Sequence, residues 1–157
     1  MSGFCCGFGH SDCYKTDSNV LTEILEEILI KYSVENFLIG EFGNFDRTFF
    51  KSAHRLKTKY TNNVKLILVK PYFTQQLLKD SDFYRKNFDE IIIPEESSNA
   101  HYKHAITVCN RWKIVKSDYV ISGVYKSYGG AFEAVKYANK KCKRIIYLPE
   151  SKKNFYK

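Results

Sequence analysis

Two consecutive glycines, Gly129 and Gly130, stand between an apolar run and an alanine-rich segment with helical spacing. The run at 118–122 is long enough for a buried strand, so this stretch is predicted to be strand, short loop, Gly-Gly and helix. Uncovered backbone N–H groups at a helix start, together with the helix dipole, favour an anion such as phosphate. A tight turn between packed elements is the structural alternative. The position after a buried strand favours the phosphate loop.

Two earlier loops also carry glycine beside small polar or charged residues. Residues 9–12 follow the first apolar run, and residues 40–46 follow the second. We expect His10 to contact a ligand, because it follows a strand end. Asp46 could accept hydrogen bonds from ribose hydroxyls or only stabilise a helix dipole, and both interpretations stay open. Glu133 could act on a ribose or an attacking water, although dipole stabilisation is the more common role at such a position.

The elements that must position these loops alternate along the chain. Apolar runs predict strands at 3–9, 36–40, 64–69, 90–94, 118–122 and 144–148. Helical spacing lies between them, at 18–32, 44–60, 101–116 and 131–138, with a short helix at 74–79 and a loop at 95–100. Asn44 is expected to cap the second helix, and Ala105, Cys109, Trp112 and Val115 are expected to face inward from the helix at 101–116. This alternation predicts an α/β fold, a three-layer, Rossmann-like and mostly parallel sheet with helices on both faces. A ligand is then expected at the carboxyl ends of the strands.

Composition narrows the class of protein. The length of 157 residues predicts one domain, 1–157, and the net charge of +8 favours nucleotides or nucleic acid as partners. Five cysteines without a Cys-x-x-Cys pair argue against a zinc site or a disulfide framework, so we expect free thiols, no metal and no cofactor. Cys109 and Cys142 are expected in the core. The sequence shows no signal peptide and no membrane span, so a cytoplasmic protein is expected.

Four motifs, in this order, resemble the SLOG superfamily, the Rossmann-like group that includes Lonely-Guy phosphoribohydrolases and the DprA proteins. The likeness covers nearly the whole chain and is nearest to the small stand-alone, YpsA-like members. The motifs are Gly-His-Ser at 9–11, Gly-x-x-Gly-x-x-Asp at 40–46 before Arg47, Asn-x-Trp at 110–112 before Ser-Asp at 117–118, and Ser-x-Gly-Gly-Ala at 127–131.

The sequence also departs from this family. Ser11 stands where relatives have an arginine that is expected to meet a phosphate. Lonely-Guy enzymes carry Pro-Gly-Gly-x-Gly-Thr-x-x-Glu, whereas this chain lacks the Pro, the Gly-Thr and the Glu, and Lys136 stands at the position of that Glu. Their catalytic arginine aligns near Cys109, with Arg111 close by. These departures weigh against hydrolase chemistry.

The resemblance and the three loops imply three functions. The first is binding, for sensing or sequestration, of a nucleotide-derived small molecule related to ADP-ribose or NAD, by a protein expected to be a homodimer. The second is hydrolysis of the N-glycosidic bond of a nucleoside monophosphate, with Glu133, Arg111 and Asp46 as catalytic candidates. The third is single-stranded nucleic-acid binding, in which bases stack on Tyr72, Phe73, Tyr84 and Phe88. The ligand-binding candidates are Gly9, His10, Ser11, Gly40, Gly43, Asp46, Arg47, Ser122, Ser127, Gly129, Gly130 and Ala131.

Overall fold

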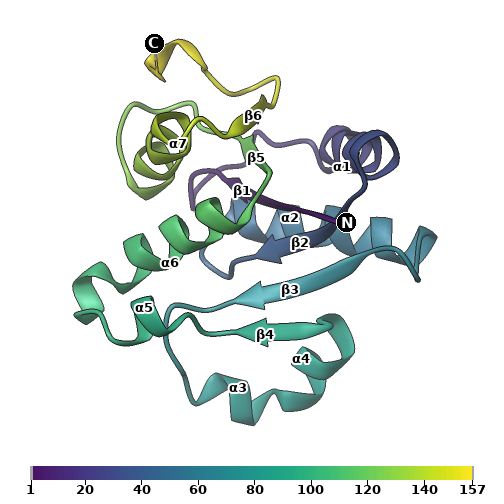
Figure 1. Ribbon diagram of the computed structural model, residues 1–157, viewed down its shortest axis with the longest axis vertical. Coiled ribbons are helices and arrows are strands. Elements are labelled where there is room, and N and C mark those ends of the chain that lie inside the picture. Colours follow the sequence, from purple (N-terminus) through teal and green to yellow (C-terminus); the bar gives the residue numbers. More distant parts are fainter. Residues whose placement is uncertain (1, 157) are drawn as a thin grey trace.

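A parallel sheet of six strands forms the centre of the protein, whose residues 2–156 are described by a computed structural model (Figure 1). The strand order is β4-β3-β2-β1-β5-β6, and every neighbouring pair is parallel. The strands are β1 (Gly3–Phe8), β2 (Val34–Ile39), β3 (Lys65–Val69), β4 (Glu90–Ile92), β5 (Tyr119–Ser122) and β6 (Arg144–Tyr147).

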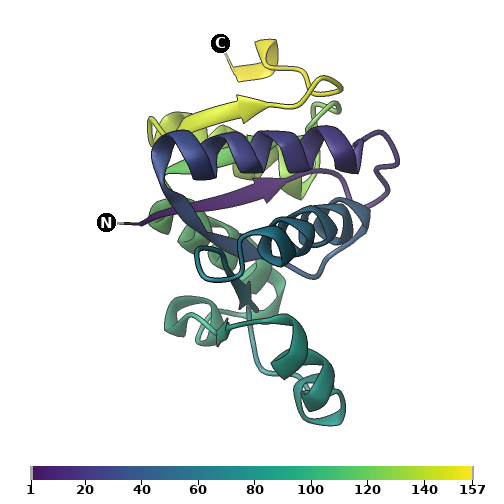
Figure 2. The same cartoon turned by 90° about the vertical axis from the view of Figure 1, so that its right-hand side faces the viewer.

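Helices cover both faces of this sheet, so the predicted α/β class and three-layer arrangement are confirmed. α1 and α2 pack on one face, and α6 and α7 pack on the other (Figures 1 and 2). Within residues 2–156, no helix has both the length and the apolar composition needed to cross a membrane. The helices are α1 (Ser18–Tyr32), α2 (Asn44–Lys59), α3 (Gln76–Lys79), α4 (Ser81–Asn87), α5 (Glu95–Ser98), α6 (Tyr102–Lys116) and α7 (Gly130–Lys140), before the 3-10 turn η1 (Asn154–Tyr156).

Local sequence explains the best-predicted elements. The Asp17 side chain caps α1 by accepting a hydrogen bond of 2.8 Å from the backbone N–H of Asn19. Successive side chains of β1 point to opposite faces, so Cys5 packs against α1 and α2 while Cys6 packs against α6 and α7. A strand buried on both faces reads as a continuous apolar run rather than an alternating one, and the central strands have this pattern.

Four details of the predicted elements are wrong. Residues 72–88 contain two short helices, α3 and α4, where one was expected, and residues 95–98 form α5 instead of a loop. Gly43, not Asn44, occupies the N-cap of α2, because Asn44 is already helical. Cys142 is exposed rather than in the core, since α7 ends at Lys140 and Cys142 adopts a left-handed conformation with φ 57°.

The buried stripe of α6 also differs from the prediction. Val115 was expected to face inward but is 54% exposed. The buried positions instead fall at Ala105, Cys109 and Lys113, in steps of four, with Ile114 beside them. Residues four apart lie on one face of a helix, so Val115 falls on the opposite side. This register directs the side chain of Lys113 toward the sheet.

The strand order changes direction between β1 and β5. β2, β3 and β4 follow one another on one side of β1. The chain then returns through α6, and β5 pairs with the other side of β1. In open parallel sheets the loops on either side of such a switch diverge and leave a crevice at the carboxyl ends of the strands. A binding site is therefore expected at the loops that follow β1 and β5.

Candidate functional site

A pocket of about 490 Å³ lies at this switch in strand order. We call it the switch-point pocket. The loops after β1 and β2, one face of α6 and the Gly-Gly loop before α7 all contribute to its wall. Its lining residues are Phe8, Gly9, His10, Ser11, Asp12, Phe42, Asp46, Ile106, Asn110, Lys113, Lys126, Tyr128, Gly129, Gly130 and Ala131.

The Gly-Gly loop presents bare backbone to this pocket. Gly129 has φ +97°, a conformation that residues with a side chain rarely adopt. A Cβ atom placed on Gly129 or Gly130 would meet no atom within 4 Å, so open space faces both residues. No side chain caps the N-terminus of α7. The first N–H groups of this helix are thus uncovered, which is the arrangement that favours an anion.

Lys113 brings a buried positive charge to the same pocket. Its side chain comes from α6, the residue is only 5% exposed, and its Nζ lies 5.1 Å from the centroid of the Phe8 ring. None of the ion pairs formed within residues 2–156 includes Lys113. A buried ammonium that has no ion-pair partner in direct contact is costly, so this lysine favours an anionic partner in the pocket.

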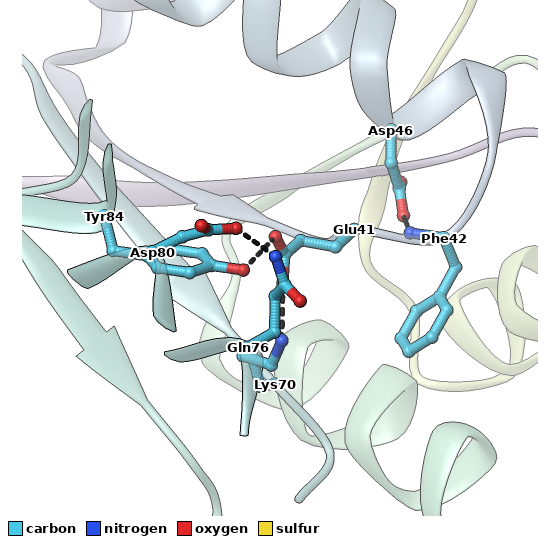
Figure 3. Close-up of polar contacts among 7 residues, drawn as sticks. All are labelled: Glu41, Phe42, Asp46, Lys70, Gln76, Asp80 and Tyr84. Atoms are coloured by element: carbon cyan, nitrogen blue, oxygen red, sulfur yellow. Dashed lines mark hydrogen bonds and ion pairs between the residues drawn. The ribbon is translucent and has the colours of Figure 1, made fainter. Parts of the chain in front are cut away.

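Asp46 is the acidic group nearest to this lysine charge. A Cβ atom on Gly40 would lie 2.7 Å from Asp46 Oδ2 and 3.1 Å from Lys113 Nζ, so glycine makes room for both groups. Asp46 Oδ2 also accepts a hydrogen bond of 2.8 Å from the backbone N–H of Phe42 (Figure 3). Burial raises the pKa of the Asp46 carboxyl, and the Lys113 charge and the Phe42 hydrogen bond oppose this shift.

His10 joins the two loops of the switch point. Its Nε2 atom accepts hydrogen bonds from the backbone N–H groups of Tyr125, at 3.2 Å, and Lys126, at 3.0 Å. Burial, followed by the Lys126 charge, lowers the pKa of His10, so the neutral ring is favoured. At the rim, Lys126 Nζ forms an ion pair of 2.8 Å with Asp12 Oδ2. His10 therefore fixes the loop that leads to Gly129.

Two other glycines on the ligand-binding list are required by packing within the protein. A Cβ atom on Gly9 would lie 2.2 Å from Cδ2 of the Phe45 ring. Gly43 has φ +94°, and a Cβ atom there would lie 2.3 Å from Cα of Ser11. Close contact between chain segments thus explains these glycines without a ligand, although Gly9 also lines the pocket.

Five ligand-binding candidates lie outside the lining of the pocket, namely Gly40, Gly43, Arg47, Ser122 and Ser127. Ser122 is buried, and its Oγ accepts a hydrogen bond of 3.3 Å from the Val124 N–H. Arg47 is exposed on α2 and donates to Asn44 Oδ1 at 3.0 Å. Ser127 is exposed beside the Gly-Gly loop.

The three catalytic candidates are not brought together. Asp46 lines the switch-point pocket, but Glu133 is exposed on α7 outside it. Arg111 lies with its guanidinium 4.8 Å from the centroid of the Tyr137 ring, also outside the lining. Within residues 2–156, no three His, Cys, Asp or Glu side chains gather in a way that could hold a metal ion.

Sequence reasoning missed Lys113 of α6, and it gave Asn110 only as part of the Asn-x-Trp motif, without a place in the site. A usable signal was present, because Lys113 continues the four-residue spacing of Ala105 and Cys109 on the apolar stripe. A lysine on such a stripe is exceptional, since fully buried lysines are rare. Phe42 and Tyr128, two partly exposed aromatic residues of the lining, were also missed.

Comparison with known proteins supports the fold. No protein-family model matches the chain, and no curated protein matches it. The X-ray structure of DNA processing protein A (DprA) from Streptococcus pneumoniae is similar, with a TM-score of 0.65 and 14% sequence identity. The match covers 99% of this chain and 53% of that one, so the chain spans about half the length of that protein. The chain therefore has the Rossmann-like fold that is also found in DprA.

Proposed function

We propose that the switch-point pocket binds the phosphate of a nucleotide-derived small molecule, such as one related to ADP-ribose or NAD, for sensing or sequestration. The observation that carries this proposal is the buried lysine, Lys113, which lines the same pocket as the uncapped N-terminus of α7. Both features favour an anion, and they come from different elements.

The charges around the pocket leave the Lys113 ammonium available to a phosphate of a ligand, because no carboxylate in the part of the chain that the structure describes pairs with it directly. Asp46 shares the space beside Gly40 with Lys113, but none of the ion pairs within residues 2–156 joins these two side chains. The ammonium of Lys113 is therefore not neutralised by direct contact, and a phosphate can accept its hydrogen bonds. The N–H groups at Gly129 and Gly130 supply further donors.

Calorimetric titration with AMP, ADP-ribose and NAD tests the proposal. We expect Lys113→Met to weaken binding about tenfold to a hundredfold, the effect of losing one hydrogen bond to a charged group. Lys116→Met is the matched control, because Lys116 lies on the exposed side of the same helix, over the Trp112 ring. Binding that Lys113→Met leaves unchanged, or no binding of any of the three compounds, would overturn the proposal.

Single-stranded DNA binding is a second candidate. The structurally similar protein is a DNA processing protein, and two exposed aromatic side chains, Tyr128 and Phe42, lie at the switch-point pocket. Of the four stacking residues expected from sequence, Tyr84 is buried and Phe88 packs against the core, whereas Tyr72 and Phe73 are exposed. Fluorescence anisotropy with an oligothymidylate tests this function, and affinity that falls steeply with salt is expected if it holds.

The hydrolase hypothesis draws no support from the arrangement of its candidate residues. Glu133 and Arg111 lie outside the pocket that Asp46 lines. A glycosidase needs an acid or base and a stabilising group at the same bond. We therefore expect no free adenine when the purified protein is incubated with AMP, and chromatographic detection of adenine above a protein-free blank would revive the hydrolase hypothesis.

A further inference from the structure

A second pocket, of about 290 Å³, lies at the carboxyl ends of β2 and β3. We call it the β3 pocket. It adjoins the switch-point pocket, because Phe42 lines both. Its lining includes Glu41, Phe42, Lys70, Tyr72, Thr74 and Tyr84.

Glu41 presents a fixed carboxylate to this β3 pocket. Lys70 Nζ lies 2.7 Å from Glu41 Oε1, and the Tyr84 hydroxyl donates to Oε2 at 3.1 Å (Figure 3). Lys70 and Tyr84 are buried, while the Glu41 side chain is partly exposed. Each carboxylate oxygen can accept a second hydrogen bond. The vicinal hydroxyls of a ribose are donors of the right kind for these two oxygens.

The two pockets differ in whether their buried lysine has an ion-pair partner. Lys70 of the β3 pocket is paired with Glu41, whereas Lys113 of the switch-point pocket belongs to no ion pair within residues 2–156 and so favours a phosphate there. The segment Glu41–Phe42 separates the pockets, and Asp46 holds it by accepting the Phe42 N–H (Figure 3). This separation orients a nucleotide, with its phosphate on one side of Phe42 and its sugar on the other.

Aromatic surface completes the β3 pocket. The Phe42 and Tyr72 residues are 47% and 37% exposed, and both line it. Any nucleobase can stack on such rings. Thr74 also lines the pocket, and its buried Oγ1 forms no hydrogen bond with any group of residues 2–156.

We propose that the β3 pocket is the ribose and base subsite for the ligand whose phosphate occupies the switch-point pocket. Glu41 accepts hydrogen bonds from the ribose hydroxyls, and the base lies against Phe42 and Tyr72. This subsite rests on the proposed function, because it extends the same ligand. It predicts that the protein selects ribonucleotides over their deoxy forms, and that Glu41 is the residue responsible.

The experiment compares AMP and ADP-ribose with their 2′-deoxyadenosine counterparts by calorimetric titration. We expect the ribose forms to bind the wild-type protein about tenfold more tightly, as the loss of one hydrogen bond to a carboxylate implies. Glu41→Gln should reduce this preference to near unity, because an amide is a weaker acceptor. Glu90→Gln is the matched control and should retain the preference, because Glu90 is exposed at the start of β4, outside the lining of both pockets.

A second variant guards against misfolding, since Glu41→Gln leaves the buried Lys70 without its counter-charge. Tyr72→Ala removes a partly exposed ring. It should weaken the binding of AMP about tenfold and leave the binding of inorganic pyrophosphate unchanged. Equal binding of ribose and deoxyribose forms, with Lys113→Met still harmful, overturns the subsite and leaves the phosphate pocket intact. If Lys113→Met has no effect, or no nucleotide binds, the proposed function fails and the subsite fails with it.

Discussion

The Nε2 atom of His10 accepts a hydrogen bond of 3.0 Å from the backbone N–H of Lys126. The two residues follow different strands, β1 and β5, so this bond spans the switch in strand order at which the pocket lies. The N–H of Tyr125 donates to the same nitrogen. A nitrogen that accepts two N–H groups cannot carry a proton itself. These two hydrogen bonds to the loop that leads to Gly129 therefore form only while the His10 ring is neutral.

Stability should consequently fall on acidification in a way that depends on His10. Its folded-state pKa lies below the ordinary value of 6.5, because of burial and the Lys126 charge. The stabilisation is thus complete above the unfolded-state pKa and is lost as the pH falls through the folded-state pKa. We expect urea unfolding to show a smaller loss of stability in His10→Gln than in the wild type between about pH 7 and about pH 5. Identical losses would contradict this role.

Gly129 and Gly130 should respond differently to alanine. Gly129 has φ +97°, so Gly129→Ala is strained and should cost about 1–3 kcal/mol. Gly130 has no unusual φ, and its added Cβ meets open space at the first position of α7, so Gly130→Ala should be neutral or stabilise by up to about 1 kcal/mol. Urea unfolding of the two variants measures both effects, and equal costs would show that backbone strain at Gly129 is not the cause.

A negative charge at Gly130 should abolish ligand binding without unfolding the protein. Two unit charges about 4 Å apart near a surface interact by about 4 kcal/mol, so Gly130→Asp should lower phosphate-ligand affinity roughly a thousandfold. An acidic residue in the first turn of α7 is favourable for the helix itself. Gly130→Asn is the matched control for size. Equal titration curves for the two variants would place the phosphate elsewhere.

Sequence periodicity predicted the sheet and the main helices because the pattern of each element is local. The cap at Asp17 and the apolar stripe of α1 lie within a few residues of one another. The spacing of α6 indicates that Lys113 is buried. Its place in the switch-point pocket could not be predicted in this way, since it depends on how α6 packs against the sheet. The same limit applies to Gly9, whose glycine is required by Phe45, a residue on a different element.

Reagents that modify thiols should distinguish Cys142 from the other cysteines in the folded protein. Cys142 is exposed, whereas Cys5, Cys6, Cys13 and Cys109 are buried. Burial raises the pKa of the Cys6 thiol to about 11 and also raises that of Cys5, which leaves little of the reactive thiolate. We expect one fast thiol in the native state and all five after denaturation without reductant. A denatured count of three would indicate a disulfide.

The Phe45 ring packs directly against Gly9. A Cβ atom on Gly9 would lie 2.2 Å from Phe45 Cδ2, far inside van der Waals contact. The ring is fully buried, and Cβ atoms on Gly7 and Gly123 would also lie within 3.2 Å of it, so it has no room to retreat. Gly9→Ala should therefore destabilise the protein by about 1–3 kcal/mol, as overpacking does in other cores.

A double-mutant cycle separates this clash from a general need for glycine at position 9. Phe45→Leu removes part of the ring volume and will itself cost stability, but it should make the additional cost of Gly9→Ala smaller than in the wild-type background. Urea unfolding of the four proteins gives the coupling free energy. If Gly9→Ala lowers the free energy of unfolding equally in both backgrounds, contact with Phe45 is not the reason that a glycine follows β1.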